Sequence, residues 1–199
     1  MLFQRRTHTC GELRESNVGE SVVLNGWVDT RRDLGGLIFI ELRDRYGITQ
    51  VVFEPTFNSS SHENAKQLRS EYVIAIEGIV RKRPEGTENN DFATGTIDVM
   101  ATKLIILNEA KTPPFPIKDS VDASEDIRLK YRYLDLRRPS IQNNIILRHK
   151  MYQVVRKYFD SINFIEVETP VLMKSTPEGA RDFLVPSRLH KGKFYALPQ

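Results

Sequence analysis

The stretch that decides the fold is "GLIFIELRD", residues 36–44. Its strict alternation predicts a β-strand with Ile38, Ile40 and Leu42 on the core face. The opposite face carries Phe39 among charged neighbours, where a simple solvent-facing side is polar. The strand is therefore expected to bury one face in a core and to present an aromatic ring on the other face.

Four further segments before and after this stretch are also typical of strands. Together the predicted strands cover residues 21–33, 36–44, 48–54, 72–83 and 95–107. A short helix is expected between the third and fourth strands, with Ser61 as its N-cap. This order matches an all-β, five-stranded OB-fold barrel better than a β-sandwich, and the helix is expected to close one end of the barrel.

The sequence changes character after the predicted barrel. Residues 108–123 contain three prolines and no sustained periodicity, which indicates a linker or hinge. Ser124 is expected to cap a helix that Pro139 interrupts. The expected division of the chain is therefore a barrel over residues 1–107, this linker, and a second domain over residues 124–199.

The second domain is expected to contain both helix and sheet. A long helix follows Pro139, with one apolar stripe that runs from Ile141 to Ile162. The stretch "NFIEVETPVL", residues 163–172, is strand-like, and residues 184–199 predict a β-hairpin with its turn at "HKGK". About 75 residues offer too little core for an independent α/β unit, so this domain is expected to be incomplete.

Composition places the chain among globular proteins. It has 199 residues, of which 40% are hydrophobic and 28% charged, and no apolar run approaches the length of a membrane helix. The first ten residues, "MLFQRRTHTC", lack the apolar stretch of a secretory signal. A single cysteine, Cys10, fits a reducing cytoplasm and is expected to be neither a metal ligand nor a nucleophile. The net charge of +3 is compatible with an anionic partner without requiring one.

Aromatic, amide and basic residues gather on the strands that bind oligonucleotides in OB-folds. Phe39 lies on the second predicted strand and Gln50 on the third. Arg31 and Arg32 are expected in the loop before the second strand, and residues 81–83, "RKR", end the fourth strand. A ring that stacks on a base, an amide that reads a base edge and cations that hold phosphates together suit single-stranded RNA.

The same residues have a second interpretation that needs no RNA. Phe39 can pack under a loop, because much of any protein surface is apolar. The two loop arginines can pair with Asp29 and Asp33. From the residues alone, both interpretations stay open.

Four stretches, taken together and in this order, resemble bacterial-type aspartyl-tRNA synthetase, a class II enzyme of subclass b, in the N-terminal portion of its chain. They are "GWVDTRRDLGGLIFIELRDRYGITQVVF", "RLKYRYLDLRRP", "FIEVETPVLMKSTPEGARDFLVPSR" and "HKGKFYALPQ". The resemblance implies an OB-fold barrel followed by the incomplete start of an α+β catalytic domain, with an antiparallel sheet and helices. A stand-alone OB-fold nucleic-acid-binding module and a lysyl-tRNA synthetase are the alternatives.

The resemblance also assigns residues to anticodon binding. Phe39 matches the residue that stacks on the central base, and Gln50 matches the amide that reads the edge of that uridine. Arg32 matches a contact to the first anticodon base, and Arg83 matches a basic contact nearby. The remaining two assigned positions are Leu34 and Asp98. Leu34 is the residue type of enzymes that accept only the aspartate tRNA, and Asp98 replaces a glutamate that is common in the family.

Three residues of the second domain are assigned in the same way. Pro170 matches the proline of motif 1, which builds a homodimer interface in the family. Glu178 lies in the stretch "STPEGARDF", which resembles a loop that closes over the amino acid, and it matches the carboxylate that contacts the ammonium of aspartate. Gln199 matches the first residue of an aspartate-binding stretch.

The implied reaction is the activation of L-aspartate with ATP and Mg²⁺ to aspartyl-adenylate, followed by transfer to tRNA(Asp). In the family, the groups that bind the triphosphate lie in motifs 2 and 3, which this sequence does not contain. The chain by itself is therefore expected to recognise the anticodon loop but to hold no catalytic residue, cofactor or metal, and to form no adenylate. Its expected setting is a cytoplasmic homodimer without a membrane partner.

Overall fold

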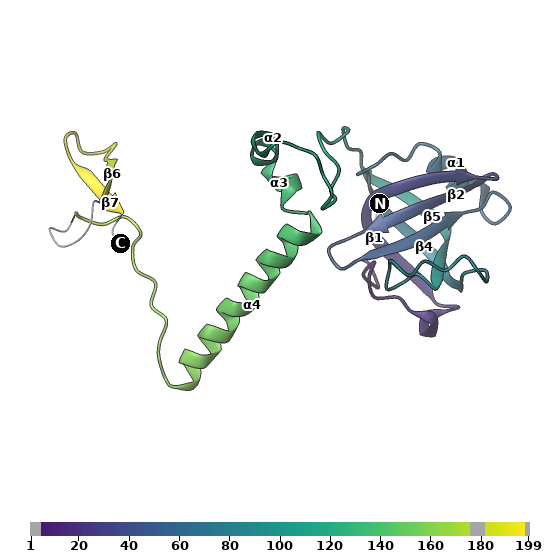
Figure 1. Cartoon of the computed structure of the whole chain (residues 1–199), viewed down its shortest axis with the longest axis horizontal. Coiled ribbons are helices and arrows are strands. Elements are labelled where there is room, and N and C mark those ends of the chain that lie inside the picture. Colours follow the sequence, from purple (N-terminus) through teal and green to yellow (C-terminus); the bar gives the residue numbers. More distant parts are fainter. Residues whose placement is uncertain (1–4, 176–181, 198–199) are drawn as a thin grey trace. The chain divides into compact units, whose positions relative to one another are not determined.

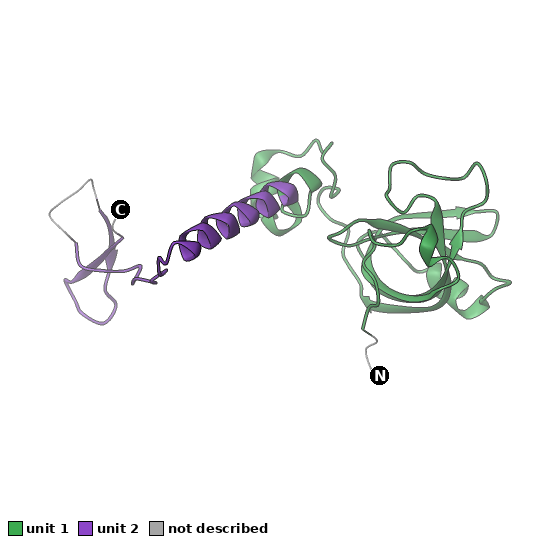
Figure 2. Ribbon diagram, turned by 90° about the horizontal axis from the view of Figure 1, so that it is seen from below, with its two compact units in different colours: residues 1–141 green, residues 142–199 purple. Residues whose placement is uncertain are grey.

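The computed structural model describes residues 5–175 and 182–197, and the chain divides into two compact units (Figure 2). The first unit is residues 1–141 and the second is residues 142–199. Among the described residues, no helix is both long enough and apolar enough to cross a membrane.

The first unit contains a closed five-stranded barrel with the strand order β1-β2-β3-β5-β4 (Figure 1). Neighbouring strands are antiparallel except β3 and β5, which are parallel. The strands are β1 (Ser21–Leu34), β2 (Leu37–Arg43), β3 (Ile48–Phe53), β4 (Val73–Lys82) and β5 (Ile97–Asn108). A closed barrel of five strands, with a helix between β3 and β4, is the predicted OB-fold arrangement.

Strand β2 has the predicted alternation. Ile38, Ile40 and Leu42 are completely buried in the barrel core, whereas Phe39 on the other face is only half-buried. The core face therefore supplies the hydrophobic free energy that holds β2 in register, and a one-residue slip would expose all three aliphatic side chains.

Strand β1 ends one residue later than predicted and contains Arg31 and Arg32, so the expectation that these arginines lie in a loop before the second strand is wrong. Both residues pair with β2, opposite Ile40 and Phe39 respectively. The turn that follows consists of two glycines, at positions 35–36, with φ of 62° and 83°. Two adjacent residues with positive φ allow the tightest hairpin, which lets the strand pairing continue to its end.

Helix α1 (Ser59–Ala65) lies between β3 and β4, as predicted, but its N-cap is Asn58 and not Ser61. The Asn58 side-chain oxygen accepts a hydrogen bond of 2.8 Å from the backbone N–H of Ser61. An asparagine three positions earlier satisfies that donor, so Ser61 becomes part of the first turn. The buried Ala65 joins the barrel core.

The chain after β5 contains the two short helices α2 (Glu125–Lys130) and α3 (Arg132–Asp135) instead of one. Tyr131 separates them, with non-helical dihedral angles of φ −109° and ψ 45°. Ser124 stands at the predicted N-cap position of α2, without a side-chain capping bond among the described residues. The prediction of one continuous helix is therefore wrong, because the helix is interrupted at Tyr131.

Helix α4 (Pro139–Ser161) begins at the proline, which suits the first helical position because that N–H needs no intrahelical partner. No residue of α4 is buried in the described structure, and its predicted stripe includes Met151 and Tyr158, which are 59% and 61% exposed. The predicted strand over residues 163–172 is wrong. Those residues pair with no neighbouring strand in the described chain, and an extended segment without a partner is not stable as sheet.

The second unit ends in the predicted β-hairpin, formed by β6 (Phe183–Pro186) and β7 (Phe194–Leu197). Gly192, with φ of 75°, lies in the predicted "HKGK" turn. One isolated bridge, between Met173 and Ala196, adds an edge to this hairpin.

Candidate nucleic-acid interface

One cavity of about 520 Å³ on the outer wall of the barrel brings together all the residues predicted to bind an anticodon. They come from β1, β2, β3, β5 and the end of β4, and they are Arg32, Leu34, Phe39, Gln50, Arg83 and Asp98. In the sequence these residues span positions 32–98. Closure of the barrel therefore brings residues that are far apart in the sequence together on one concave surface.

The strand register sets the order of the side chains in the cavity. Arg32 on β1 stands opposite Phe39 on β2, and Glu41 on β2 stands opposite Gln50 on β3. Opposite residues on one face of an antiparallel pair lie about 5 Å apart, so Arg32 is an immediate neighbour of Phe39, and Gln50 lies diagonal to Phe39 across β2 and β3. An aromatic ring with polar groups at its rim is the arrangement that stacks one base and contacts its edge.

The guanidinium of Arg32 connects two side chains of this row. Its Nη2 donates to Glu41 Oε1 at 2.8 Å and to Gln50 Oε1 at 3.4 Å. The Gln50 amide thereby has its oxygen engaged and its NH₂ group directed to other partners. Because Gln50 is only 9% exposed, this amide is held in one orientation, with donors available to a base carbonyl.

Arg83 contributes a buried cation to the cavity. Its Nε donates to the Ile97 carbonyl at 2.9 Å and its Nη1 to the Thr87 carbonyl at 3.4 Å. No acceptor for Nη2 is found among the described residues. Burial lowers the pKa of Arg83, with nearby Asp98 acting in the opposite direction. A buried donor without a partner is costly to folding, which is typical of a group that a ligand completes.

Asp98 and Arg81 form a cross-strand ion pair beside Arg83. Arg81 Nε lies 2.6 Å from Asp98 Oδ1, and Arg81 Nη2 lies 3.3 Å from Oδ2. Burial raises the pKa of Asp98 above its ordinary value, and the contact with Arg81 only partly offsets this effect. The short side chain of Asp98 is therefore committed to Arg81 on the cavity wall.

The raised pKa of Asp98 predicts a pH dependence of stability. The folded state binds this proton more tightly than the unfolded state, so Asp98 favours folding most at low pH. This stabilisation is lost as the pH rises from about 4, the ordinary pKa of an aspartate in the unfolded chain, through the higher pKa of Asp98 in the folded state. Thermal unfolding across this range is expected to show the stability of the parent chain, relative to Asp98→Asn, decreasing with rising pH. Asp122→Asn, which removes an exposed carboxylate, measures the effect of net charge. A stability of the parent chain relative to Asp98→Asn that increases with pH contradicts the assignment.

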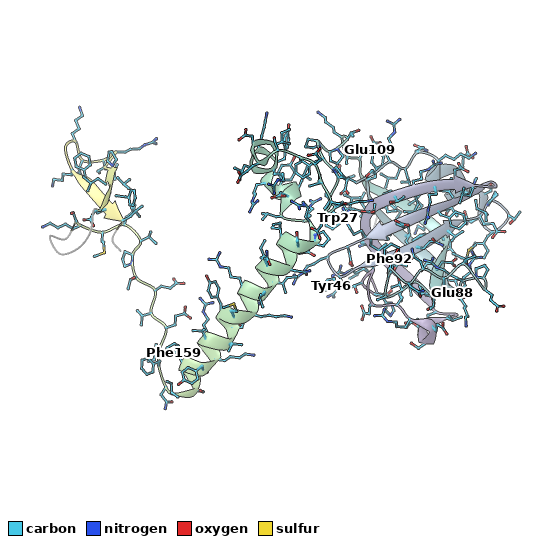
Figure 3. The ribbon with its side chains drawn as sticks, viewed as in Figure 1. Trp27, Tyr46, Glu88, Phe92, Glu109 and Phe159 are labelled. Carbon is cyan, nitrogen blue, oxygen red and sulfur yellow. The ribbon has the colours of Figure 1, made fainter. Side chains whose placement is uncertain are left out.

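The cavity also contains residues that the sequence did not identify. The turn after Arg83 lines it through Thr87, Glu88 and Asn89, of which Glu88 is labelled in Figure 3. Pro84 and Gly86 mark this segment as a turn in the sequence, but nothing in the sequence indicates which way the turn folds. Lys82 is not among the lining residues of the cavity, although the sequence grouped it with its basic neighbours.

The alternative interpretation, in which the β1 arginines pair with nearby aspartates, is correct for Arg31. Arg31 Nη2 lies 3.2 Å from Asp33 Oδ2, and Arg31 does not line the cavity. Asp29 pairs with Arg43 and not with either β1 arginine. Arg32 is therefore the only one of the two adjacent arginines that belongs to the candidate interface.

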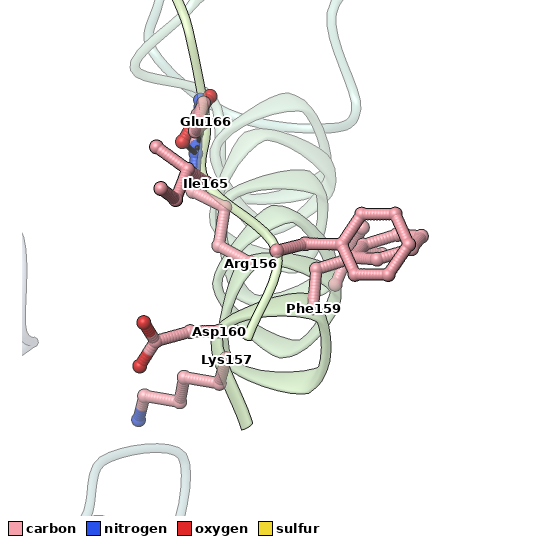
Figure 4. A pocket seen from close by; sticks show the side chains of 8 residues that line it. Arg156, Lys157, Phe159, Asp160, Ile165 and Glu166 are labelled. Atoms are coloured by element: carbon pink, nitrogen blue, oxygen red, sulfur yellow. Dashed lines mark hydrogen bonds and ion pairs between the residues drawn. The ribbon is translucent and has the colours of Figure 1, made fainter. Parts of the chain in front are cut away.

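A larger hollow of about 720 Å³ lies in the second unit, at the end of α4 (Figure 4). Phe159 and Phe164 form an apolar wall with ring centroids 5.3 Å apart, and Arg156 pairs with Glu166 at 2.9 Å. It contains none of the predicted site residues. Of those assigned to the second unit, Pro170 lies in the segment before β6, whereas Glu178 and Gln199 lie outside the described residues.

Burial also determines the character of the single cysteine. Cys10 is completely buried, and desolvation, followed by the charge of Asp44, raises the pKa of its thiol strongly. A thiol with a raised pKa stays protonated at neutral pH and is a poor nucleophile. Cys10 is therefore a core residue of the barrel.

Known proteins similar to this chain are ligases that charge tRNA. The aspartate–tRNA(Asp/Asn) ligase of Salinibacter ruber is 61% identical over 198 residues, which are 98% of this chain and 32% of the relative. The aspartate–tRNA ligase of Geobacillus kaustophilus is 59% identical over 194 residues, again 98% of this chain and 33% of the relative. Among solved structures, the asparaginyl-tRNA synthetase of Pyrococcus horikoshii with asparaginyl-adenylate matches 96% of this chain and 42% of its own, with 27% identity and a TM-score of 0.78.

These matches cover between 96% and 98% of this chain. Residues 22–109 match the family of OB-fold nucleic acid binding domains, and residues 124–199 match the family of class II tRNA synthetases (D, K and N). The chain spans about a third of the length of the curated relatives it matches. An OB-fold module without a synthetase portion does not account for residues 124–199. The similarity to aspartate–tRNA ligases therefore extends through both parts of this chain.

Proposed function

We propose that the barrel binds the anticodon loop of tRNA(Asp) through the cavity on its outer wall. The observation that carries this proposal is the convergence of all six predicted residues on that one cavity. In the proposed complex, the Phe39 ring stacks on the central base and the Gln50 amide contacts its edge. The guanidinium of Arg83, which has an unused donor, takes an acceptor of the RNA.

The chemistry of the row favours uridine as the central base. The Gln50 oxygen is engaged by Arg32, so the amide presents NH₂ donors to the base. Uracil offers a carbonyl acceptor where cytosine carries an amino donor. Two donors facing each other in a buried site leave both unsatisfied, which disfavours cytosine.

Base substitution in an anticodon stem-loop tests this proposal. The chain is expected to bind the stem-loop with a central uridine more tightly than one with a central cytidine, by about 1–3 kcal/mol. Gln50→Ala is expected to remove most of that difference, whereas Lys82→Ala, outside the cavity, is expected to keep it. Titrations at one fixed salt concentration provide the measurement, because RNA affinity depends strongly on salt. Equal binding of the two stem-loops by the parent chain contradicts the proposal.

We further propose that the whole protein is an ATP-dependent aspartate–tRNA ligase and acts in the cytoplasm as a homodimer. Its dimer interface is proposed to include the exposed apolar stripe of α4 and the segment with Pro170, with aspartate bound by Glu178 and Gln199. Leu34, which is 60% exposed at the cavity, is proposed to favour the aspartate tRNA over the asparagine tRNA. Relatives of both kinds are similarly identical to this chain, so that preference is a property to measure with both tRNAs.

ATP and Mg²⁺ are assigned to the remainder of the ligase. Within the described residues, no group of three or more histidine, cysteine, aspartate or glutamate side chains is arranged to hold a metal ion. The chain alone is expected to give no aspartate-dependent pyrophosphate exchange, in a standard assay with a complete aspartate–tRNA ligase as the positive control. Exchange above background would contradict this assignment.

A further inference from the structure

The segment that leaves the barrel, residues 112–140, has an apolar cluster of its own. Phe115, Ile117 and Leu134 form this cluster, which is distinct from the core inside the barrel. A cavity of about 240 Å³, lined by residues of both, separates part of this exit segment from the barrel wall. A shared hydrophobic core therefore does not account for how the exit segment is held on the barrel.

Arg137 is the residue of the exit segment that contacts the barrel through charge and stacking. Its guanidinium lies over the ring of Trp27 on β1, 4.6 Å from the ring centroid. Its Nη1 also lies 3.9 Å from Oε2 of Glu71, next to β4. Trp27, which is labelled in Figure 3, is half-buried on β1. A planar guanidinium can stack on an indole and face a carboxylate at the same time, which an ammonium group does less well.

The barrel side of this contact is rigid. Arg43 donates to both carboxylate oxygens of Glu71, at 2.7 and 2.9 Å, and it also pairs with Asp29. Glu71 itself has φ of 65°, a conformation that is costly for a residue with a side chain. Its N–H donates to the Val28 carbonyl at 2.7 Å, which holds this corner against β1. A glutamate kept at a position that suits glycine indicates that its carboxylate is needed there.

The exit segment is locked around Arg137 in a similar way. The carboxylate of Asp135 is completely buried and lies 2.9 Å from Arg138 Nη1. Arg138 also donates to the carbonyls of Lys118 and Asp119, both at 3.1 Å. These bonds tie α3 to the start of the segment, so Arg137 extends from a fixed turn.

We propose that Arg137 is a positioning residue that latches the exit segment to the barrel, with the Trp27 ring and the Glu71 carboxylate as its socket. The latch fixes the path by which the chain leaves the barrel. It also gives the stretch "RYLDLRR" a mechanical role, because Asp135 and Arg138 shape the turn and Arg137 docks it. This inference does not depend on the proposed binding of RNA.

Amide hydrogen exchange and the fluorescence of Trp27 test the latch. Trp27 is the single tryptophan of the chain, so its emission reports the socket directly. Arg137→Gln is expected to speed exchange of the amides of residues 131–138 by about two- to thirtyfold, the range that corresponds to one cation–π contact. The same variant is expected to increase acrylamide quenching of Trp27, while exchange of the β1–β5 amides stays unchanged.

Two variants separate latching from an effect of charge. Arg137→Lys keeps the charge but not the planar group, and it is expected to give an intermediate exchange rate. Arg128→Gln removes the same charge from α2 and is expected to leave both readouts at the parent values. Unchanged exchange at residues 131–138 in Arg137→Gln overturns the proposal, and so does faster exchange throughout the barrel, which would make Arg137 a general stability residue.

Discussion

Replacement of Phe39 with alanine is expected to weaken binding of the tRNA(Asp) anticodon stem-loop by about 1–3 kcal/mol, roughly 5- to 150-fold in dissociation constant. The ring lies half-exposed on the outer face of β2, and Ile38 and Ile40 fill the core on the other face. Truncation therefore removes the stacking platform and leaves the barrel core intact. Isothermal titration at fixed salt measures the affinity, and the melting temperature of the variant shows that it is folded.

Two further variants isolate the stacking contribution. Phe39→Leu keeps an apolar side chain but lacks a π-face, and it is expected to lose most of the same affinity. Phe57→Ala removes another exposed aromatic ring, 48% exposed and outside the cavity, and it is expected to bind as the parent chain does. Parent-like affinity in Phe39→Ala means that the ring only packs beside the loop, and the proposed RNA interface is then wrong.

Replacement of Arg43 with alanine is expected to destabilise the barrel by about 3–5 kcal/mol. Its guanidinium serves two carboxylates, Asp29 and Glu71, whose side chains are only 10% and 8% exposed. Without Arg43, these charges lose their main partner in a poorly solvated place, which costs far more than the loss of an exposed ion pair. Urea denaturation followed by circular dichroism measures the free energy of unfolding.

The exposed pair of Lys103 and Glu77, with 2.8 Å between nitrogen and oxygen, is a matched control. Lys103→Ala is expected to change the free energy of unfolding by less than about 1 kcal/mol, because water screens that pair. The double variant Arg43→Ala with Glu71→Gln is expected to recover part of the loss by removing one stranded charge. A cost for Arg43→Ala no larger than that for Lys103→Ala contradicts the role of the buried network.

The barrel was predictable from the sequence because its signals are local. Alternation in β2 identified the core face. The predictions were wrong where contacts between distant segments, or their absence, outweighed the local preference of the sequence. Arg31 and Arg32 carry charges that suggest a loop, yet pairing with β2 keeps them in the strand. Residues 163–172 have strand character but no partner strand in the described chain, so they stay unpaired.

The six assigned residues lie in one cavity, but the geometry of that cavity could not be predicted from the sequence. The resemblance assigned Arg32, Phe39 and Gln50, but the link from Arg32 to the Gln50 oxygen depends on strand register. The pairing of Asp98 with Arg81 depends on the order in which β4 and β5 close the barrel. The turn of residues 84–89 has no periodicity, and its position over the cavity follows from tertiary contacts alone.

The pairing order of the barrel also has a consequence for synthesis on the ribosome. β5 fills the gap between β3 and β4, and its bond to β3 is a short parallel ladder through Val51 and Val52. A nascent chain that has emerged only as far as β4 therefore has two unpaired strand edges and an open apolar interior. Such an intermediate is prone to association with other chains. Aggregation during translation is therefore expected to become less favourable once β5, through Asn108, has left the exit tunnel and can close the barrel.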